Sequence, residues 1–378
     1  MIDEKKSKNQ KIIIGVFFAI FIIAVVVGFV LAFSNKNNTN ENSSTGSQTT
    51  ASATSKNNTS SSTTSSTTVD STKNLSITNG GSYDLSGSYE SITINTSKEV
   101  TLNLSDVEIS NSNGPAINVE AAKSVIIVLN GNNKITVTTT EDLDGAIYSK
   151  DDLVLSGSGS LEISSNYHGI AANDTLVING GSYVINSEKD GINANDVITI
   201  NDGNITITNE EDGIHCDGLL EINGGTFNIT AAEGLEATYV KINNGTINIS
   251  ATDDGINAAN KSTDYEVTVE INGGNITIKM GQGDTDAIDS NGNLYVNGGT
   301  INITANSPFD YDGKAEKNGG TIIVNGTEID SITNQFGGEM NGGMNGGQMM
   351  PNENMNNGGQ MNPENMRNNR GQMRNMNQ

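Results

Sequence analysis

The sequence predicts an all-β protein, a right-handed single-stranded parallel β-helix with coils of about 22 residues. Two observations carry this prediction. A phrase of an acidic residue, Gly, Ile and a polar residue recurs about every 22 residues, and two short strand patterns follow each copy. A fixed period of this length indicates units that stack on one another. The phrase stands at residues 190–193, 212–215, 233–236, 254–257 and 286–289, with Leu for Ile in the third copy and Ala for Gly in the last.

Each coil is expected to contain three short strands. Residues 197–200 and 204–207 alternate apolar and polar side chains and are rich in Ile and Thr, as in strands that bury one face. The phrase supplies a third strand with an inward Ile. Three strands per coil are typical of the right-handed β-helix, whereas the repeats of the left-handed hexapeptide form and of the calcium-binding nonapeptide form are missing. A sandwich or propeller stays open as an alternative.

A turn that begins with Asn, often followed by two Gly residues, separates the two strands after each phrase. Asn tolerates left-handed backbone angles and Gly adopts them freely, so the turn forms a sharp corner. Stacked coils would align the Asn amides in a hydrogen-bonded ladder with a structural role. The predicted ladder consists of Asn179, Asn201, Asn223, Asn243, Asn272, Asn297 and Asn318.

The amino-terminal segment predicts a membrane anchor. Residues 12–33 contain only apolar residues and Gly, enough to cross roughly 30 Å of hydrocarbon. Four Lys residues within residues 1–11 predict a cytoplasmic amino terminus and place the rest of the chain outside the cell. A cleaved signal peptide is the alternative, but the apolar run is longer than such peptides use. The expected location is therefore the cell membrane, crossed once.

Composition divides the rest of the chain. Residues 34–73 consist largely of Ser, Thr and Asn and predict a disordered linker, and residues 335–378, rich in Gly, Asn, Met and Gln, predict a disordered tail. The β-helix domain is expected at residues 74–334, with longer early coils and a cap at residues 75–104. Residues 261–266 and 279–285 are expected to be loop insertions, because the phrase spacing stretches to 32 residues there.

The predicted domain is strongly acidic. Residues 70–330 hold 38 of the 44 acidic residues but only 11 of the 20 Lys and Arg residues. Such a surface repels nucleic acid, so DNA and RNA are not expected as partners. It suits divalent cations, although an acidic surface also keeps an extracellular protein soluble. The sequence does not indicate an oligomeric state.

Stacking would place the acids of successive phrases in one column, roughly 4.8 Å apart. Carboxylates at this spacing raise each other's pKa unless a cation lies between them, and Ca²⁺ prefers the oxygen ligands that the phrases offer. The alternative is that each acid caps a turn by accepting backbone N–H groups. The predicted calcium ligands are Asp190, Asn193, Asp212, His215, Glu233, Glu236, Asp253, Asp254, Asn257, Asp284, Asp286 and Asp289.

The phrase and the Asn-Gly-Gly turns within coils of about 22 residues resemble the clostridial carbohydrate-binding β-helix family related to pectate lyases. The resemblance covers about residues 75–330. It implies an extracellular, calcium-containing protein of a Gram-positive bacterium that binds cellulose or pectin-like acidic polysaccharide. Asp253, Asp254 and Asn257 match the calcium motif of the lyase relatives best. The resemblance also implies that calcium could bridge protein carboxylates to those of the polysaccharide.

Binding is favoured over catalysis. A lyase of this kind uses Arg or Lys as its base, and residues 70–330 contain no Arg. Lys241 and Lys279 are nearest to the column by register and are expected to point to solvent. Opposed carboxylates of a glycoside hydrolase could occur anywhere in the acidic column. A structural cell-surface protein is a further alternative, because Trp is absent and aromatic residues make up 4% of the chain. Cys216, the only cysteine, is expected to be an inward core residue.

Overall fold

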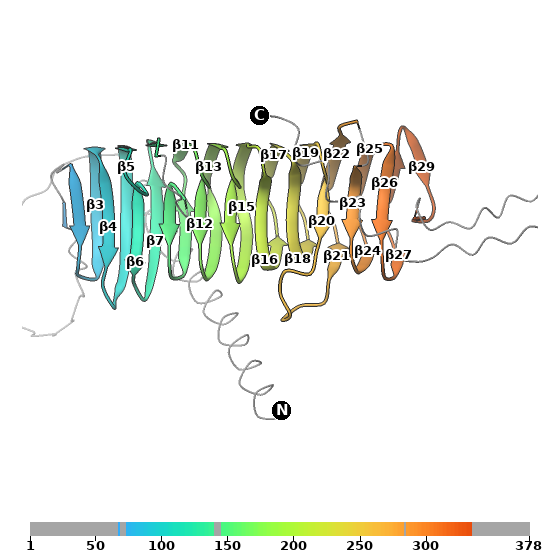
Figure 1. Ribbon diagram of the computed structural model, residues 1–378, viewed down its shortest axis with the longest axis horizontal. Helices are drawn as coiled ribbons and strands as arrows, with labels where there is room; N and C mark the ends of the chain where they lie inside the picture. Colours follow the sequence, from blue (N-terminus) through green and yellow to red (C-terminus); the bar gives the residue numbers. More distant parts are fainter. Residues whose placement is uncertain (1–66, 69–72, 140–144, 283–284, 335–378) are drawn as a thin grey trace, which may run out of the picture. The chain divides into compact units, whose positions relative to one another are not determined.

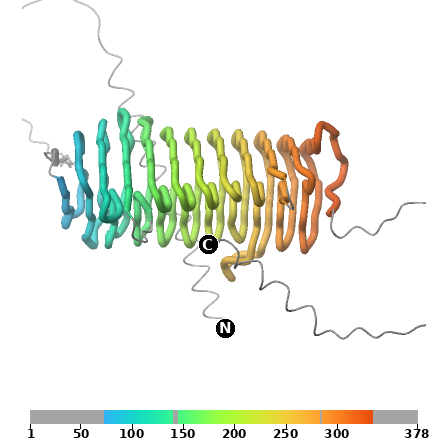
Figure 2. Tube along the Cα trace, turned by 45° about the horizontal axis from the view of Figure 1, so that its top comes forward, coloured from blue at the N-terminus to red at the C-terminus, as the bar shows by residue number. Residues whose placement is uncertain are grey.

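The computed structural model describes residues 67–68, 73–139, 145–282 and 285–334. These residues form a parallel β-solenoid of about 11 turns without a helix, in which the coils lie side by side along one axis (Figures 1 and 2). The parallel solenoid expected from the repeat is confirmed, and its right-handed sense stays a prediction. No helix among the described residues is long and apolar enough to span a membrane. The predicted anchor at residues 12–33 and the predicted tail at residues 335–378 lie outside them, as does the predicted linker at residues 34–73 except for residues 67, 68 and 73.

Three faces of parallel strands run along the solenoid. The first face contains all the phrases, together with the corresponding strands of the earlier coils. It consists of β2 (Asn74–Ile77), β4 (Ser91–Asn95), β6 (Ile117–Ala121), β9 (Ile147–Ser149), β12 (Ile170–Ala172), β14 (Ile192–Ala194), the first parts of β16 (Asp212–Ile222) and β18 (Glu233–Ile242), β20 (Ile256–Ala258), β23 (Asp286–Ser290) and β26 (Ser307–Tyr311).

The second face begins with β1 (Thr67–Thr68), which pairs with β3 (Gly81–Tyr89). Several long strands bend from one face to the next, so that β16 and β18 continue onto the second face and β3, β5, β13 and β15 pass from the second to the third. The remaining second-face strands are β5 (Glu99–Asn111), β7 (Ser124–Asn130), β10 (Leu153–Gly157), β13 (Thr175–Ser187), β15 (Val197–Thr208), β21 (Thr268–Ile271), β24 (Asn293–Val296) and β27 (Ala315–Lys317).

The third face is completed by strands that pair with the far ends of β5, β13 and β15. At the carboxyl-terminal end, β29 (Thr327–Ile329) turns back antiparallel on β28 and closes the solenoid. The third-face strands are β8 (Asn132–Val137), β11 (Ser160–Ser165), β17 (Thr226–Ala231), β19 (Thr246–Ala251), β22 (Asn275–Met280), β25 (Thr300–Thr304) and β28 (Thr321–Val324). The expected insertion at residues 279–285 therefore begins later, because Lys279 and Met280 still belong to β22.

The core is a set of inward-facing columns, one residue per coil. The Ile of each phrase pairs with its counterpart in the next coil, as in Ile170, Ile192 and Ile214, and these side chains are fully buried. Cys216 is also buried and lies in register with Ala194 and Ala237, as expected. Apolar area removed from water, roughly 25 cal/mol per Å², is the main source of stability.

A ladder of Asn amides follows the corner between the second and third faces. The Nδ2 of Asn201 donates to the Oδ1 of Asn179 at 2.8 Å, and the same bond repeats at 2.8 to 3.0 Å through to Asn318. The second Gly of the turn takes a left-handed conformation, for example Gly225 with φ +100°. A Cβ on Gly298 would lie 2.4 Å from the carbonyl oxygen of Asn272 in the preceding coil. The close stacking of coils therefore requires Gly there.

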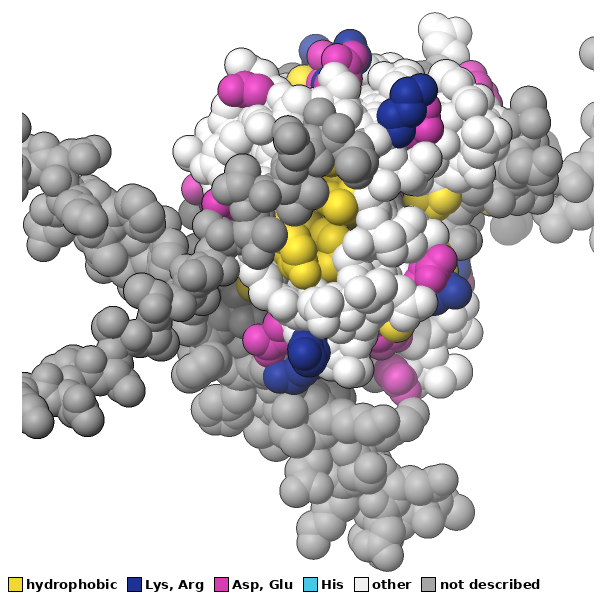
Figure 3. Space-filling model, turned by 90° about the vertical axis from the view of Figure 1, so that its left-hand side faces the viewer, with side chains coloured by type: hydrophobic (Ala, Val, Ile, Leu, Met, Phe, Trp, Pro, Cys, Tyr) yellow, Lys and Arg dark blue, Asp and Glu magenta, His cyan; other side chains and the backbone are white. Residues whose placement is uncertain are grey.

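The amino-terminal end of the solenoid exposes part of its core. Seen end-on, apolar side chains lie in the middle of this end, surrounded by polar groups (Figure 3). In the first coil, Leu75 and Tyr83 are only partly buried although both pack against the core.

Candidate functional site

Two columns of polar side chains run along the first face, on either side of the buried Ile. The acid column takes one residue from the start of each phrase, and the polar column takes the residue after Ile. The backbone N–H groups of Gly169, Gly191 and Gly234 donate to the carbonyls of the acid-column residues in the next coil and hold the columns in register. The acid column contains His168, Asp190, Asp212, Glu233, Asp254 and Asp286, and the polar column contains Asn193, His215, Glu236, Asn257, Asp289 and Asp310.

Some acid-column carboxylates also serve the backbone. The Oδ1 of Asp190 accepts the N–H of Asp212 at 3.1 Å, and the Oδ1 of Asp254 accepts the N–H of Asp286 at the same distance. This is the turn-capping role considered as the alternative to metal binding. Each of these two carboxylates has a second oxygen, so capping leaves one oxygen for another contact.

The first part of the columns, which we call the histidine half (His168 to Glu236), is rich in internal contacts. The Nδ1 of His215 lies 2.8 Å from Asp212 Oδ2 and 2.7 Å from Glu236 Oε2. His168 Nδ1 lies 3.3 Å from Asp190 Oδ2, and Asn193 Nδ2 donates to the same oxygen at 2.7 Å. Both histidines of the chain therefore lie among carboxylates.

Lys261 adds a second positive charge to the histidine half. Its Nζ lies 2.8 Å from Glu236 Oε1. It lies in the loop between β20 and β21, whose backbone N–H groups at Lys261 and Ser262 donate to the buried hydroxyl of Thr238. Sequence reasoning missed this contact, because the insertion has no counterpart in other coils from which a register could be inferred.

The pKa values of the histidine half follow from these contacts. Burial favours neutral His215, but its hydrogen bonds to Asp212 and Glu236 raise its pKa to about 11. Burial would likewise raise the pKa of Glu236, but His215 and Lys261 hold it well below its usual range. Burial and the charge of Glu236 raise the pKa of Glu233 to about 8. The protein thus neutralises much of this half with its own side chains.

The second part, which we call the aspartate half (Asp254 to Asp289), differs. Burial, together with neighbouring carboxylates, raises the pKa of Asp254 to about 6 and that of Asp289 to about 7. Among the described residues, no Lys or His side chain forms an ion pair with Asp254 or Asp289. Repulsion between carboxylates therefore persists in this half.

An unpaired amide oxygen lies at the boundary between the halves. Asn257, 8% exposed, donates from Nδ2 to Glu233 Oε2 at 2.9 Å and to Glu236 Oε1 at 3.4 Å, both on the preceding coil. Its Oδ1 is buried and has no hydrogen-bond partner within the described part of the chain. The amide nitrogen thus contacts the preceding coil, and the coil that follows places Asp289 in register with Asn257. The buried hydroxyl of Thr285 is also unpaired.

The predicted metal ligands are not all brought together. Two sets place one ligand atom per residue within 4.8 Å of one another: Asp190, Asp212 and His215, and Asp212, Glu233 and Glu236. Asp253 is exposed beside the column, and Asp284 lies outside the described residues. The hydroxyl of Ser307 donates to Asp286. Carboxylate and amide oxygens suit Ca²⁺, whereas imidazole suits transition metals better. Both sets belong to the histidine half, and among the described residues of the aspartate half no three such side chains come this close. By ligand chemistry alone, the aspartate half suits Ca²⁺ better than the histidine half does.

The two lysines predicted to lie nearest the columns, and the one that reaches them, are poor candidates for the base of a lyase. Lys241 lies on the second face and pairs with Glu221 at 2.9 Å, and Lys279 lies on β22 of the third face. Lys261 reaches the column, but Glu236, although opposed by burial, raises its pKa. A lysine held in its charged form is a poor proton acceptor.

A β-solenoid with one acidic, repeated face is the class of protein that the fold and the columns define. The chain matches the model of a family described as carbohydrate-binding domain-containing protein, over residues 71–306 and 220–355. The protein belongs to this family, which confirms the resemblance inferred from the sequence. Among solved structures, it is similar to a polysaccharide lyase-like protein from C. thermocellum, which was solved as a gadolinium derivative. The two sequences are 24% identical, the match covers 68% of this chain and 90% of that chain, and the TM-score is 0.39. Comparison with curated proteins gives no match.

Proposed function

We propose that this protein binds acidic polysaccharide outside the cell through Ca²⁺ held in the aspartate half of the columns, and that residues 12–33 anchor it in the membrane. Membership of the carbohydrate-binding family supports the polysaccharide, and the apolar run with its preceding lysines supports the anchor. The proposal involves no chemical reaction.

The unpaired Oδ1 of Asn257 beside Asp254 and Asp289 is the observation that carries the calcium site. A buried amide oxygen without a donor costs about 1 to 3 kcal/mol. Two neighbouring carboxylates with raised pKa values add repulsion. A cation with oxygen ligands relieves both costs at once, whereas a hydrogen-bond donor would relieve only the first.

The residues of the aspartate half would hold the ion with part of its coordination open to the surface. Asp254 and Asn257 would supply oxygen ligands from one coil, and Asp286 and Asp289 would supply them from the next coil. When bound, Ca²⁺ would supply a positive charge that carboxylates of a uronic acid chain can share with the protein. Without it, the acidic face repels such a chain.

Binding of polygalacturonate to the purified full chain tests this proposal. Wild type is expected to bind with Ca²⁺ and to lose binding in EDTA. Asp289→Asn removes one ligand charge while keeping the side-chain size, and it is expected to weaken Ca²⁺ binding by at least about tenfold, which is about 1.4 kcal/mol.

Asp202→Asn is the matched control, because Asp202 is an exposed acid at a turn away from the columns. This variant removes the same charge and should bind Ca²⁺ and polygalacturonate as wild type does. Binding that survives EDTA, or equal loss in both variants, would contradict the proposal. Absorbance near 235 nm in the same samples would detect an unsaturated product and thus lyase activity.

A further inference from the structure

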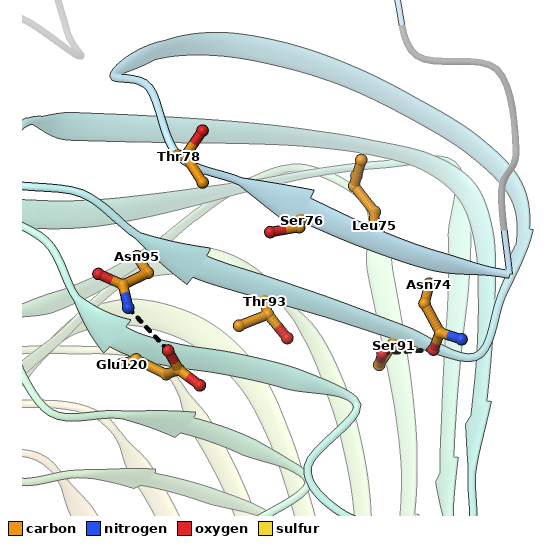
Figure 4. A pocket seen from close by; sticks show the side chains of 8 residues that line it. All are labelled: Asn74, Leu75, Ser76, Thr78, Ser91, Thr93, Asn95 and Glu120. Carbon is orange, nitrogen blue, oxygen red and sulfur yellow. Dashed lines mark hydrogen bonds between the residues drawn. The ribbon is translucent and has the colours of Figure 1, made fainter.

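A polar groove lies on the first face near its amino-terminal end, far along the same surface from the aspartate half. It is an open depression with a volume of about 560 Å³, lined by polar side chains and Leu75 from β2, β4 and β6 and the residues beside them (Figure 4). Its floor is the row of outward-facing side chains between the buried residues Ile77, Ile92 and Ile94. The lining residues are Asn74, Leu75, Ser76, Thr78, Ser91, Thr93, Asn95 and Glu120.

The side chains of the groove form a regular grid. Ser76 pairs in register with Thr93, and Asn74 pairs with Ser91. Along one strand, outward-facing residues are roughly 6.6 Å apart, and neighbouring strands are roughly 4.8 Å apart. Hydroxyl and amide groups therefore recur at two fixed spacings across the surface.

Part of this grid is held rigid, and part is free to bind. The hydroxyl of Ser91 donates to Asn74 Oδ1 at 2.7 Å, and Asn95 Nδ2 donates to Glu120 Oε2 at 2.8 Å (Figure 4). The hydroxyls of Ser76, Thr78 and Thr93 make no hydrogen bond with another described residue. Each can donate once and accept twice, so the centre of the groove offers unused hydrogen-bonding capacity between fixed edges.

We propose that this groove is a second saccharide site, which binds a neutral, hydroxyl-rich chain without a metal ion. The groove carries a single charge, the carboxylate of Glu120, and that carboxylate is engaged by Asn95. It contains no cation for a uronate and too few acids for Ca²⁺. The hydroxyl groups of a neutral sugar can donate and accept hydrogen bonds, as Ser and Thr hydroxyls do. They can therefore pair with both the donors and the acceptors of the lining.

The position of the groove connects it with the start of the polar column. Thr93 lies in the same column as Asn118, Tyr148, Ala171 and Asn193, which leads into the polar column. The four steps from Thr93 to Asn193 span roughly 19 Å. A chain lying along the first face could therefore contact the groove with neutral units and the polar column with charged ones. The neutral site does not depend on the calcium site.

Isothermal titration of the full chain with cellohexaose, xylohexaose and mannohexaose in EDTA tests this inference. At least one of these neutral probes is expected to bind at millimolar concentration or below. Thr93→Arg fills the centre of the groove and removes one free hydroxyl, so it should weaken that binding at least about tenfold.

Thr101→Arg is the matched control, because Thr101 faces outward on the second face of β5, away from the groove. It should bind as wild type does. If Thr93→Arg fails to fold, as judged by circular dichroism, Ser76→Arg on the exposed first strand replaces it. The inference is overturned if no probe binds, if binding needs Ca²⁺, or if the folded groove variant binds as the control does. Asp289→Asn should leave neutral binding unchanged, so the two sites can fail separately.

Discussion

Replacing His215 with Asn tests whether the protein itself supplies the cation of the histidine half. His215 is 15% exposed and contacts Asp212 and Glu236, which are 16% and 5% exposed. Removing one member of a buried ion pair costs about 3 to 5 kcal/mol. Asn occupies the same column in the preceding coil and can keep one hydrogen bond, so we expect the low end of this range, about 3 kcal/mol. For a domain of this size, that lowers the midpoint of thermal unfolding by about 6 °C.

The assay is thermal unfolding of the full chain at pH 7 in EDTA, followed by circular dichroism. His168→Asn is the comparison, because His168 contacts one acid at the longer distance of 3.3 Å. We expect it to lower the midpoint by about a third as much. With Asn at position 215, the set Asp212, Glu233 and Glu236 loses the positive charge of the imidazole and keeps Lys261 as its counter-charge. Added Ca²⁺ should therefore stabilise His215→Asn more than wild type. A variant that unfolds within 1 °C of wild type in EDTA would refute the reasoning.

Three further predictions concern pH and packing. The folded-state pKa of His215, about 11, exceeds its ordinary value of 6.5. The stability that protonated His215 gives the folded protein is therefore complete below pH 6.5 and is lost as the pH rises toward 11. The difference in unfolding midpoint between wild type and His215→Asn should shrink as the pH rises from 7 to 10. Calcium affinity, measured by titration calorimetry, should fall as pH drops through 7 and 6, because Asp289 and Asp254 become protonated there. Cys216→Ala should lower the free energy of unfolding by only about 1 kcal/mol, since Ala fills this position in adjacent coils, and a larger loss in urea denaturation would contradict that packing.

The repeat predicts the coil, the strands and the columns because one strand register determines the next. Once Ile192 and Ile214 are aligned, Asp190 and Asp212 must lie in the same column, and the structure places them there. The same logic aligns the Asn amides of the corner. These features depend on backbone pairing alone, which a period in the sequence reveals.

The charge balance of the columns could not be predicted in this way. Lys261 comes from an insertion that occurs once, and its contact with Glu236 depends on how that loop folds back. The direction of the Asn257 amide, with Nδ2 toward Glu236, depends on side-chain packing. The groove near Thr93 lies in coils without the phrase, where the repeat leaves the outward residues unspecified.

The Asn ladder has a direction. Every amide donates toward the amino-terminal end and accepts from the carboxyl-terminal side, so the amide dipoles add along the axis. Hydrogen bonds in such a row polarise and strengthen one another. The row starts at Asn179, whose own Nδ2 is buried without a partner among the described residues. This corner of the solenoid therefore carries a row of aligned dipoles from Asn179 to Asn318, and replacing an Asn in the middle of the row would divide it into two shorter rows.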